Sequence, residues 1–227
     1  MKVLMTCEHA GNYIPAKWEE KISIPKSELQ SHKGWDIGAF AVFEELKSLA
    51  DANFYTKTSR LLIEANRSLH HPNLFSKYSK ALSKEEREEL INDHYQPYRF
   101  AVEQWIEKQT EPVLHLSVHS FTNQLNGVVR NCDIGFLYDP KIATEKEFAL
   151  LWKMQLAIEE PSIRVRMNYP YKGTADGFTT HLRRLFPRNY GGIEIEINQK
   201  LTSEAPVAIA ETLRQTLFNA LTLQKAL

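Results

Sequence analysis

Residues 112–121, PVLHLSVHSF, decide the fold class of this chain. Their side chains alternate with the two-residue period of a β-strand, so that one face carries Leu114, Leu116 and Val118 and the other Val113, His115, Ser117 and His119. A strand buried on both faces is normally a run of Val, Ile and Leu, so two imidazoles and a hydroxyl on one face need an explanation. His119 lies at the end of the strand, where α/β sheets bring side chains to a ligand-binding crevice. We therefore expect His119 to be a site residue and His115, deeper in the strand, to be a hydrogen-bonded core residue.

Strand and helix patterns alternate along the rest of the chain. Short apolar runs predict strands at 2–7, 53–57, 61–64, 132–138, 163–167 and 192–199. Helical periodicity predicts helices over 36–51, 83–109, 141–159 and 202–223, with Pro97 interrupting the second, and a further helix that starts near residues 176–180. This alternation predicts an α/β fold, a three-layer α/β/α sandwich around a mainly parallel sheet. Since no repeat or linker divides the chain, we expect one domain over residues 1–227.

The composition excludes several classes of protein. Lys and Arg number 28, as do Asp and Glu, so no basic field favours nucleic acid or an anionic membrane. No apolar run reaches the roughly 18 residues of a membrane span, and the first residues hold too few apolar side chains for a signal peptide. Two cysteines form neither a disulfide framework nor a CxxC metal motif. We expect a cytoplasmic protein that acts on a small molecule; its oligomeric state is left open.

A second histidine occupies a position like that of His119. His9 follows the predicted strand 2–7 by two residues, and parallel strands bring their carboxyl ends to the same edge of a sheet. Two imidazoles and one carboxylate form the open ligand set of a hydrolytic zinc. Asp36, Glu8 and Glu64 are carboxylates near predicted strand ends. Asp36 also suits the N-cap of the helix that follows it, so the residues alone leave the third ligand open.

Further polar residues follow or line the predicted strands. Glu194 and Glu196 share the face of strand 192–199 that lies opposite its isoleucines. Two carboxylates on a central strand are costly unless they are paired, protonated or metal-bound, although an edge strand with a solvated face would also carry them. Arg60, Asn66 and Arg67 cluster around another predicted strand, and guanidinium and amide groups suit a substrate carboxylate.

Six motifs occur in an order that resembles the N-formylglutamate amidohydrolase family: TCEHAGNYIP, WDIGA, SRLLIEANRS, LSVHSF, PYKGTADGFTT and IEIEINQ. The resemblance extends from about residue 3 to residue 200. The family is similar to zinc carboxypeptidases and aspartoacylases, whose fold is an α/β/α sandwich around a mixed sheet. The resemblance implies a zinc amidohydrolase, with one Zn²⁺ per chain, that hydrolyses N-formyl-L-glutamate to formate and glutamate.

The resemblance also implies a metal-ligand set. EHAG implies His9, HSF implies His119, and WDIGA implies Asp36 as the third ligand in place of a helix cap. Related deacylases carry a Glu three residues after the first ligand, where this chain has Asn12. The alternatives to Asp36 as third ligand therefore remain Glu8, Asn12 and Glu64.

The other motifs imply roles around the metal. IEIEINQ implies Glu196 as general base. SRLLIEANR implies Arg60, Asn66 and Arg67 at the substrate carboxylate or the oxyanion, with Arg60 and the zinc holding the developing oxyanion, although Glu64-Ala65 stands where the family usually has Asp-Leu. In the variable loop 170–184, Lys172 and His181 are expected to contact the substrate.

Two other functions fit the same residues. One is a zinc amidase or peptidase-like enzyme for another N-acylated amino acid or a small peptide. The other is a non-catalytic binding domain of the same fold, against which the retained set of His9, His119 and Glu196 argues.

Overall fold

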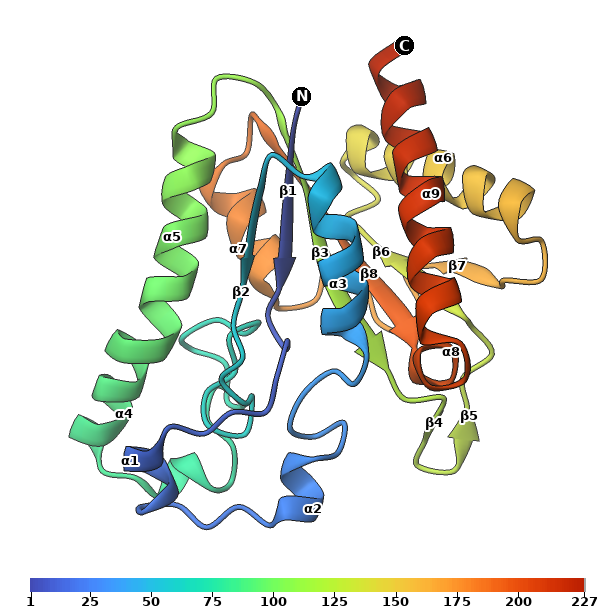
Figure 1. The fold of residues 1–227 in the computed structure, drawn as a ribbon. Helices are drawn as coiled ribbons and strands as arrows, with labels where there is room; N and C mark the ends of the chain where they lie inside the picture. The colour runs from blue at the N-terminus through green and yellow to red at the C-terminus, as the bar shows by residue number, and fades with distance from the viewer. Residues whose placement is uncertain (227) are drawn as a thin grey trace.

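The computed structural model describes residues 1–226, and its main sheet has six strands in the order β2-β1-β3-β8-β6-β7 (Figure 1). The strands are β1 (Lys2–Cys7), β2 (Ala52–Tyr55), β3 (Val113–Phe121), β6 (Ile134–Leu137), β7 (Val165–Met167) and β8 (Tyr190–Asn198). Neighbouring strands are parallel except for β6 and β8, which are antiparallel. The predicted mixed, mainly parallel sheet is confirmed.

Helices cover both faces of this sheet (Figure 1). One face packs against α3 (Ala39–Leu46), α6 (Ala143–Glu159) and α9 (Pro206–Ala226). The other packs against α5 (Gln96–Glu107) and α7 (Phe178–Leu185). Shorter helices lie outside these layers: α1 (Ala16–Glu19), α2 (Lys26–Leu29), α4 (Lys84–Leu90) and α8 (Gln199–Glu204). The three-layer α/β/α arrangement is confirmed.

Strand β3 separates two different environments, as its alternation predicts. Leu114, Leu116 and Val118 belong to the core formed with α3, α6 and α9. On the opposite face, His115 is fully buried and its ring nitrogens lie 2.6 Å from the hydroxyls of Thr6 and Tyr190. Burial lowers the pKa of His115 to about 4, so it is neutral at physiological pH. The prediction that His115 is a core residue is confirmed.

Residues 61–64 form turns instead of the predicted strand. The backbone N–H groups of Leu62 and Ile63 bond to the carbonyl of Ser59, which folds the segment back on itself. Leu62 and Ile63 are buried in a small second core with Trp18 and Leu90. A short apolar run does not distinguish a strand from a packed turn, and this core fixes the segment that leads to Glu64.

Three other predicted elements differ in detail. The helical stretch 83–109 begins at the predicted Ser83 capping box and contains a π-helical turn, Ile91–Tyr95, just before Pro97. The last helix is divided into α8 and α9 at Pro206, because the residue before a proline disfavours the helical conformation. The loop 122–131 contains a hairpin of β4 (Gln124–Leu125) and β5 (Val128–Val129), whose turn residues Asn126 and Gly127 have positive φ.

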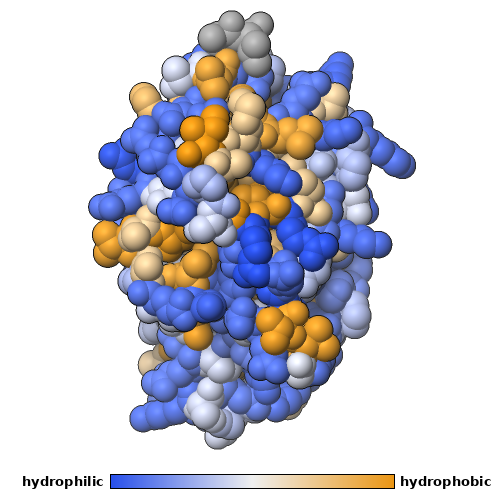
Figure 2. All heavy atoms as spheres, turned by 90° about the vertical axis from the view of Figure 1, so that its right-hand side faces the viewer, coloured by the Kyte–Doolittle hydropathy of each residue, from blue (hydrophilic) through white to orange (hydrophobic). Residues whose placement is uncertain are grey.

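The face over α6 and α9 carries separate apolar patches among charged side chains (Figure 2). Large apolar side chains exposed on these helices are Leu150, Met154, Ile158, Val207, Phe218 and Leu223. No helix within residues 1–226 combines the length and hydropathy that crossing a membrane requires.

Candidate active site

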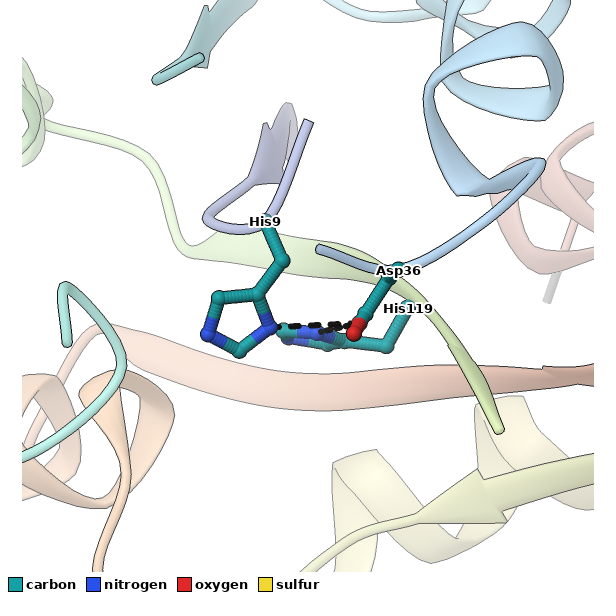
Figure 3. Close-up of side chains that lie close together, drawn as sticks. All are labelled: His9, Asp36 and His119. Atoms are coloured by element: carbon teal, nitrogen blue, oxygen red, sulfur yellow. Dashed lines mark hydrogen bonds and ion pairs between the residues drawn. The ribbon is translucent and has the colours of Figure 1, made fainter. Parts of the chain in front are cut away.

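Three segments that are distant in sequence bring two imidazoles and a carboxylate together (Figure 3). His119 lies near the end of β3, and His9 follows the neighbouring strand β1. Asp36 lies in the loop before α3, where its backbone N–H donates to the carbonyl of His9 at 3.2 Å. The N-cap of α3 is Gly38, with φ of 85° and no side-chain cap bond, so Asp36 is not the helix cap that its position suggested.

The three side chains face one another in a way that suits a metal ion. Oδ2 of Asp36 lies 3.2 Å from Nδ1 of His9 and 2.9 Å from Nδ1 of His119. One potential ligand atom from each residue lies within 4.8 Å of the other two, and all three residues are buried. Two nitrogens and one oxygen converging from separate segments are the donor set of a catalytic zinc site.

The outer ring nitrogen of each histidine contacts a second carboxylate. Nε2 of His9 bonds to Oε1 of Glu64. Nε2 of His119 lies 3.2 Å from Oε2 of Glu8 and 2.9 Å from Oγ of Ser117. Metal-binding histidines commonly donate their other N–H to a carboxylate, which fixes the tautomer and the orientation of the ring. Glu8 and Glu64, two of the alternative third ligands, therefore lie behind the imidazoles.

Interactions within the cluster favour the ionised forms of Asp36 and His119 over their neutral forms. Burial disfavours the carboxylate of Asp36, but His9, His119 and Arg60 outweigh it and hold the pKa of Asp36 well below its usual range. Burial likewise opposes the imidazolium of His119, yet its bonds to Asp36 and Glu8 raise the pKa of His119 well above the ordinary value. The cluster holds the carboxylates of Asp36, Glu8 and Glu64, and a divalent cation could replace the histidine protons that offset their charge.

Glu196 differs from these paired carboxylates. It lies on β8 in register with His119 on β3. It is 6% exposed, and within residues 1–226 its Oε2 has no hydrogen-bond partner. Burial raises the pKa of Glu196 to about 8, with Asp36 and Glu194 adding to the effect. An unpaired buried carboxyl beside a candidate metal site, with its pKa shifted towards neutrality, fits a group that exchanges a proton during a reaction.

Arg60 is held by two of the carboxylates. Its Nε donates to Oε2 of Glu64 at 2.8 Å, its Nη2 forms an ion pair with the same oxygen at 2.6 Å, and its Nη1 donates to Oδ1 of Asp36 at 3.2 Å. Burial opposes the charge, but these carboxylates raise the pKa of Arg60 above its already high value. Arg60 thus ties the turn at 59–64 to the loop that carries Asp36.

A cavity of about 180 Å³ opens beside the cluster. Its lining includes His9, Asp36, His119, Glu196, Arg60, Asn66, Arg67 and Lys172. Asn66 accepts a bond from the N–H of Phe178 at 2.6 Å, and Arg67 donates to the backbone carbonyl of Asp176. The structure therefore brings together all but one of the residues that the sequence assigned to a site.

His181 is the exception. Its ring nitrogen lies 2.8 Å from Oε1 of Glu103 on α5, and it lines a different and larger cavity. Helix α7 turns this side chain away from the small cavity, so the expected contact between His181 and a substrate there has no support. Asn12, an alternative ligand, donates to the carbonyl of Leu29.

Five other lining residues were not assigned a site role from the sequence, although Glu194 was noted there on one strand face with Glu196. They are Ser120, Tyr171, Ala175, Asp176 and Glu194. Glu194 could have been assigned to the site from the sequence, because it lies two residues before Glu196 and therefore on the same face of β8. Asp176 accepts the backbone N–H of Ser68 at 3.0 Å, a loop-to-loop contact that leaves no periodic pattern in the sequence.

One solved structure resembles the whole chain closely. The gene product Atu2144 from Agrobacterium tumefaciens aligns with a TM-score of 0.83 and 29% identity, over 99% of this chain and 92% of that chain. The CwlD amidase of Clostridioides difficile, in complex with the GerS lipoprotein, aligns with a TM-score of 0.49 and 12% identity. The alignment covers 98% of this chain and 100% of that chain. A metallo-carboxypeptidase from Burkholderia cenocepacia aligns with a TM-score of 0.42 and 10% identity. The alignment covers 98% of this chain and 57% of that chain.

The comparison with curated proteins yields no match. The comparison with family models does: the model described as N-formylglutamate amidohydrolase matches residues 1–203. This match includes every residue of the cluster and of the small cavity. The chain belongs to the N-formylglutamate amidohydrolase family.

Proposed function

We propose that this protein is a metal-dependent hydrolase that cleaves the amide bond of N-formyl-L-glutamate to give formate and glutamate. The observation that carries the proposal is the convergence of His9, Asp36 and His119 beside the unpaired carboxyl of Glu196. Family membership supports the reaction type.

His9, Asp36 and His119 would hold one Zn²⁺, His9 and His119 through Nδ1. Both Nδ1 atoms face the Asp36 carboxylate, and both Nε2 atoms are engaged by the carboxylates behind them. Bound zinc supplies a Lewis acid and lowers the pKa of a coordinated water.

Glu196 takes the proton of the attacking water and returns it to the leaving amine nitrogen. Its Oε2 is free of protein partners within residues 1–226, and a pKa raised to about 8 makes its ionised form a stronger base than an ordinary glutamate, able to accept a proton and then donate it. The rigid backbone of β8 and its register with His119 fix this carboxyl relative to the metal ligands.

The cations of the cavity have separate roles. Arg60 is fixed by Glu64 and Asp36 and lines the cavity, so it is preorganised to stabilise the negative charge that develops on the carbonyl oxygen. Lys172 and Arg67 bind the carboxylates of the substrate, and Asn66 adds a directed amide contact.

A test of this proposal measures formate release from N-formyl-L-glutamate by the purified full chain, with added zinc and with a chelator. We expect formate release that the chelator abolishes and zinc restores. Equal release with and without the chelator would overturn metal dependence, and no release with zinc present would overturn the substrate.

One observation favours a second substrate within the same chemistry. The half-buried carboxylate of Glu194 lines the cavity and accepts a bond from Thr179 at 2.7 Å. A carboxylate there disfavours a second anionic group and suits a hydrogen-bond donor. The alternative is an N-acyl amino acid with a neutral or cationic side chain, which a panel including N-formyl-L-glutamine and N-formyl-L-arginine distinguishes by kcat/KM.

A further inference from the structure

A second, larger cavity is lined by residues of α5 and α7, the two helices that cover one face of the sheet (Figure 1). Its volume is about 850 Å³, within the roughly 300–1,000 Å³ of small-molecule sites. Ser68 and Leu69, the π-helical turn, α5 and α7 contribute its walls. Single π-helical turns occur frequently at functional sites.

Arg99 supplies a buried positive charge in this cavity. The residue is 4% exposed, and its guanidinium carbon lies 4.9 Å from the ring centroid of Tyr95 and 4.2 Å from that of Phe178. Its Nη1 donates to the carbonyls of Ala65 and Arg67 at 3.1 and 3.2 Å. Among residues 1–226, no carboxylate oxygen lies within 4 Å of the guanidinium. A buried cation without an acidic partner is costly.

The surroundings of Arg99 combine a second guanidinium and one carboxylate with apolar surface. The exposed Arg184 lines the cavity, and the carboxylate of Glu103 there is engaged by the ring of His181 at 2.8 Å. Leu69 and Phe100 line the cavity and are 46% and 60% exposed. Guanidinium groups bind carboxylates bidentately, and the apolar walls would cover a flat organic group but leave an inorganic anion poorly solvated.

We propose that the cavity lined by Arg99, Arg184, Tyr95, Phe100 and Leu69 is a second ligand site, for a small organic carboxylate with an aromatic or other apolar body. The carboxylate neutralises the charge of Arg99 and Arg184, and the apolar body packs against Tyr95, Phe100 and Leu69. The two cavities share no lining residue, although Arg67 of one and Ser68 of the other are consecutive, and the proposal does not depend on the hydrolase activity.

The probe is benzoate, titrated into the full chain while backbone amide shifts are followed by NMR. We expect saturable binding with a Kd for benzoate below about 10 mM, the weak end of ligand affinities. The amide chemical shifts of Ser68, Leu69 and Phe100 should change. Ser120 and Lys172, which line the small cavity, should not shift. No saturation, or shifts centred on Ser120 and Lys172, would overturn the proposal.

Two arginine variants distinguish binding in the larger cavity from a general effect of positive surface charge on benzoate binding. Replacing Arg99 would also remove the bonds that hold the backbone at Ala65 and Arg67, so the exposed Arg184→Ala is the better test. We expect Arg184→Ala to raise the Kd for benzoate about fivefold, while the control Arg188→Ala, an exposed arginine just after α7, leaves it unchanged. Inorganic phosphate should bind more weakly than benzoate. Equal Kd values for the two arginine variants, or tighter binding of phosphate, would contradict the proposal.

Discussion

Glu196 is the residue on which the proposed chemistry depends most. Its carboxyl is buried beside His119, and its Oε2 lacks a hydrogen-bond partner within the described chain. We predict that Glu196→Gln lowers kcat about 100- to 10,000-fold but leaves metal content unchanged, because Glu196 is outside the proposed ligand set. Steady-state kinetics and elemental analysis of one preparation test both parts. A near-normal kcat would remove the assignment.

The carboxylates behind the histidines should act on metal affinity. Glu64 contacts Nε2 of His9, and Glu8 contacts Nε2 of His119. Since such partners orient a ligating imidazole, we predict that Glu64→Gln or Glu8→Gln weakens zinc binding about 10- to 100-fold. Competition with a chromogenic chelator measures this. The control Glu103→Gln alters a similar contact with His181 outside the site and should leave zinc affinity unchanged; equal affinities in all three variants would contradict the account.

Zinc binding should also depend on pH. The bonds to Asp36 and Glu8 outweigh burial and raise the pKa of His119 well above its usual value, so His119 is protonated at neutral pH in the metal-free protein. Zinc must displace this proton, so its affinity rises with pH until the raised pKa of His119 is passed. Calorimetry of zinc binding near pH 7, in buffers of different ionisation enthalpy, should detect the release of protons. If no proton were released, His119 would not be protonated in the metal-free protein.

Lys172 is one of the two cations assigned to the substrate carboxylates. It lines the small cavity, and its charge would interact equally with the bound substrate and the transition state. We therefore predict that Lys172→Met raises KM about tenfold with little change in kcat. Kinetics of the exposed-surface variant Lys146→Met supply the control. A loss in kcat without a change in KM would assign Lys172 a different role.

At the scale of elements, strand β6 controls the position of Glu196. Gly135 pairs with Glu196 across the antiparallel β6–β8 ladder, and a Cβ at Gly135 would lie 2.0 Å from the carbonyl oxygen of Tyr169 and 3.4 Å from Cβ of Glu196. We predict that Gly135→Ala destabilises the protein by about 1–3 kcal/mol and lowers activity as well, because β6 must shift.

A helix-cap variant provides the control for this prediction. Ser83→Ala removes the capping box of α4, far along the chain from β6, and should cost about 1 kcal/mol without loss of kcat. Denaturant unfolding and kinetics compare the two variants. If Gly135→Ala behaved like Ser83→Ala, retaining full kcat, β6 would not position Glu196.

The elements also show which features the sequence could reveal. Strands β3 and β8 were predictable because alternation is encoded locally, and with it the placement of His119 and Glu196 on one face. The turn at 61–64 was not, since its shape depends on burial against Trp18 and Leu90. The direction of the His181 side chain was not predictable either, because it is set by the packing of α7 against α5.

For the whole molecule, the metal should contribute to stability. The cluster gathers Asp36, Glu8 and Glu64 with two histidines in a buried region, and a cation that binds the folded state stabilises it by mass action. At free zinc of about 100 times Kd we expect a gain of about 2.7 kcal/mol. Thermal melts with zinc and with chelator test this, and identical midpoints would argue against a site that binds zinc in the folded protein.

The central claim is that His9, Asp36 and His119 hold one metal ion that the amide hydrolysis requires. The most direct measurement is zinc per chain, by elemental analysis, in the wild-type protein and in His119→Ala, combined with formate release from N-formyl-L-glutamate. The account predicts about one zinc per chain in the wild type and the loss of both zinc and activity in the variant. A wild-type protein that takes up no zinc, or a variant that keeps full turnover without it, would contradict the claim.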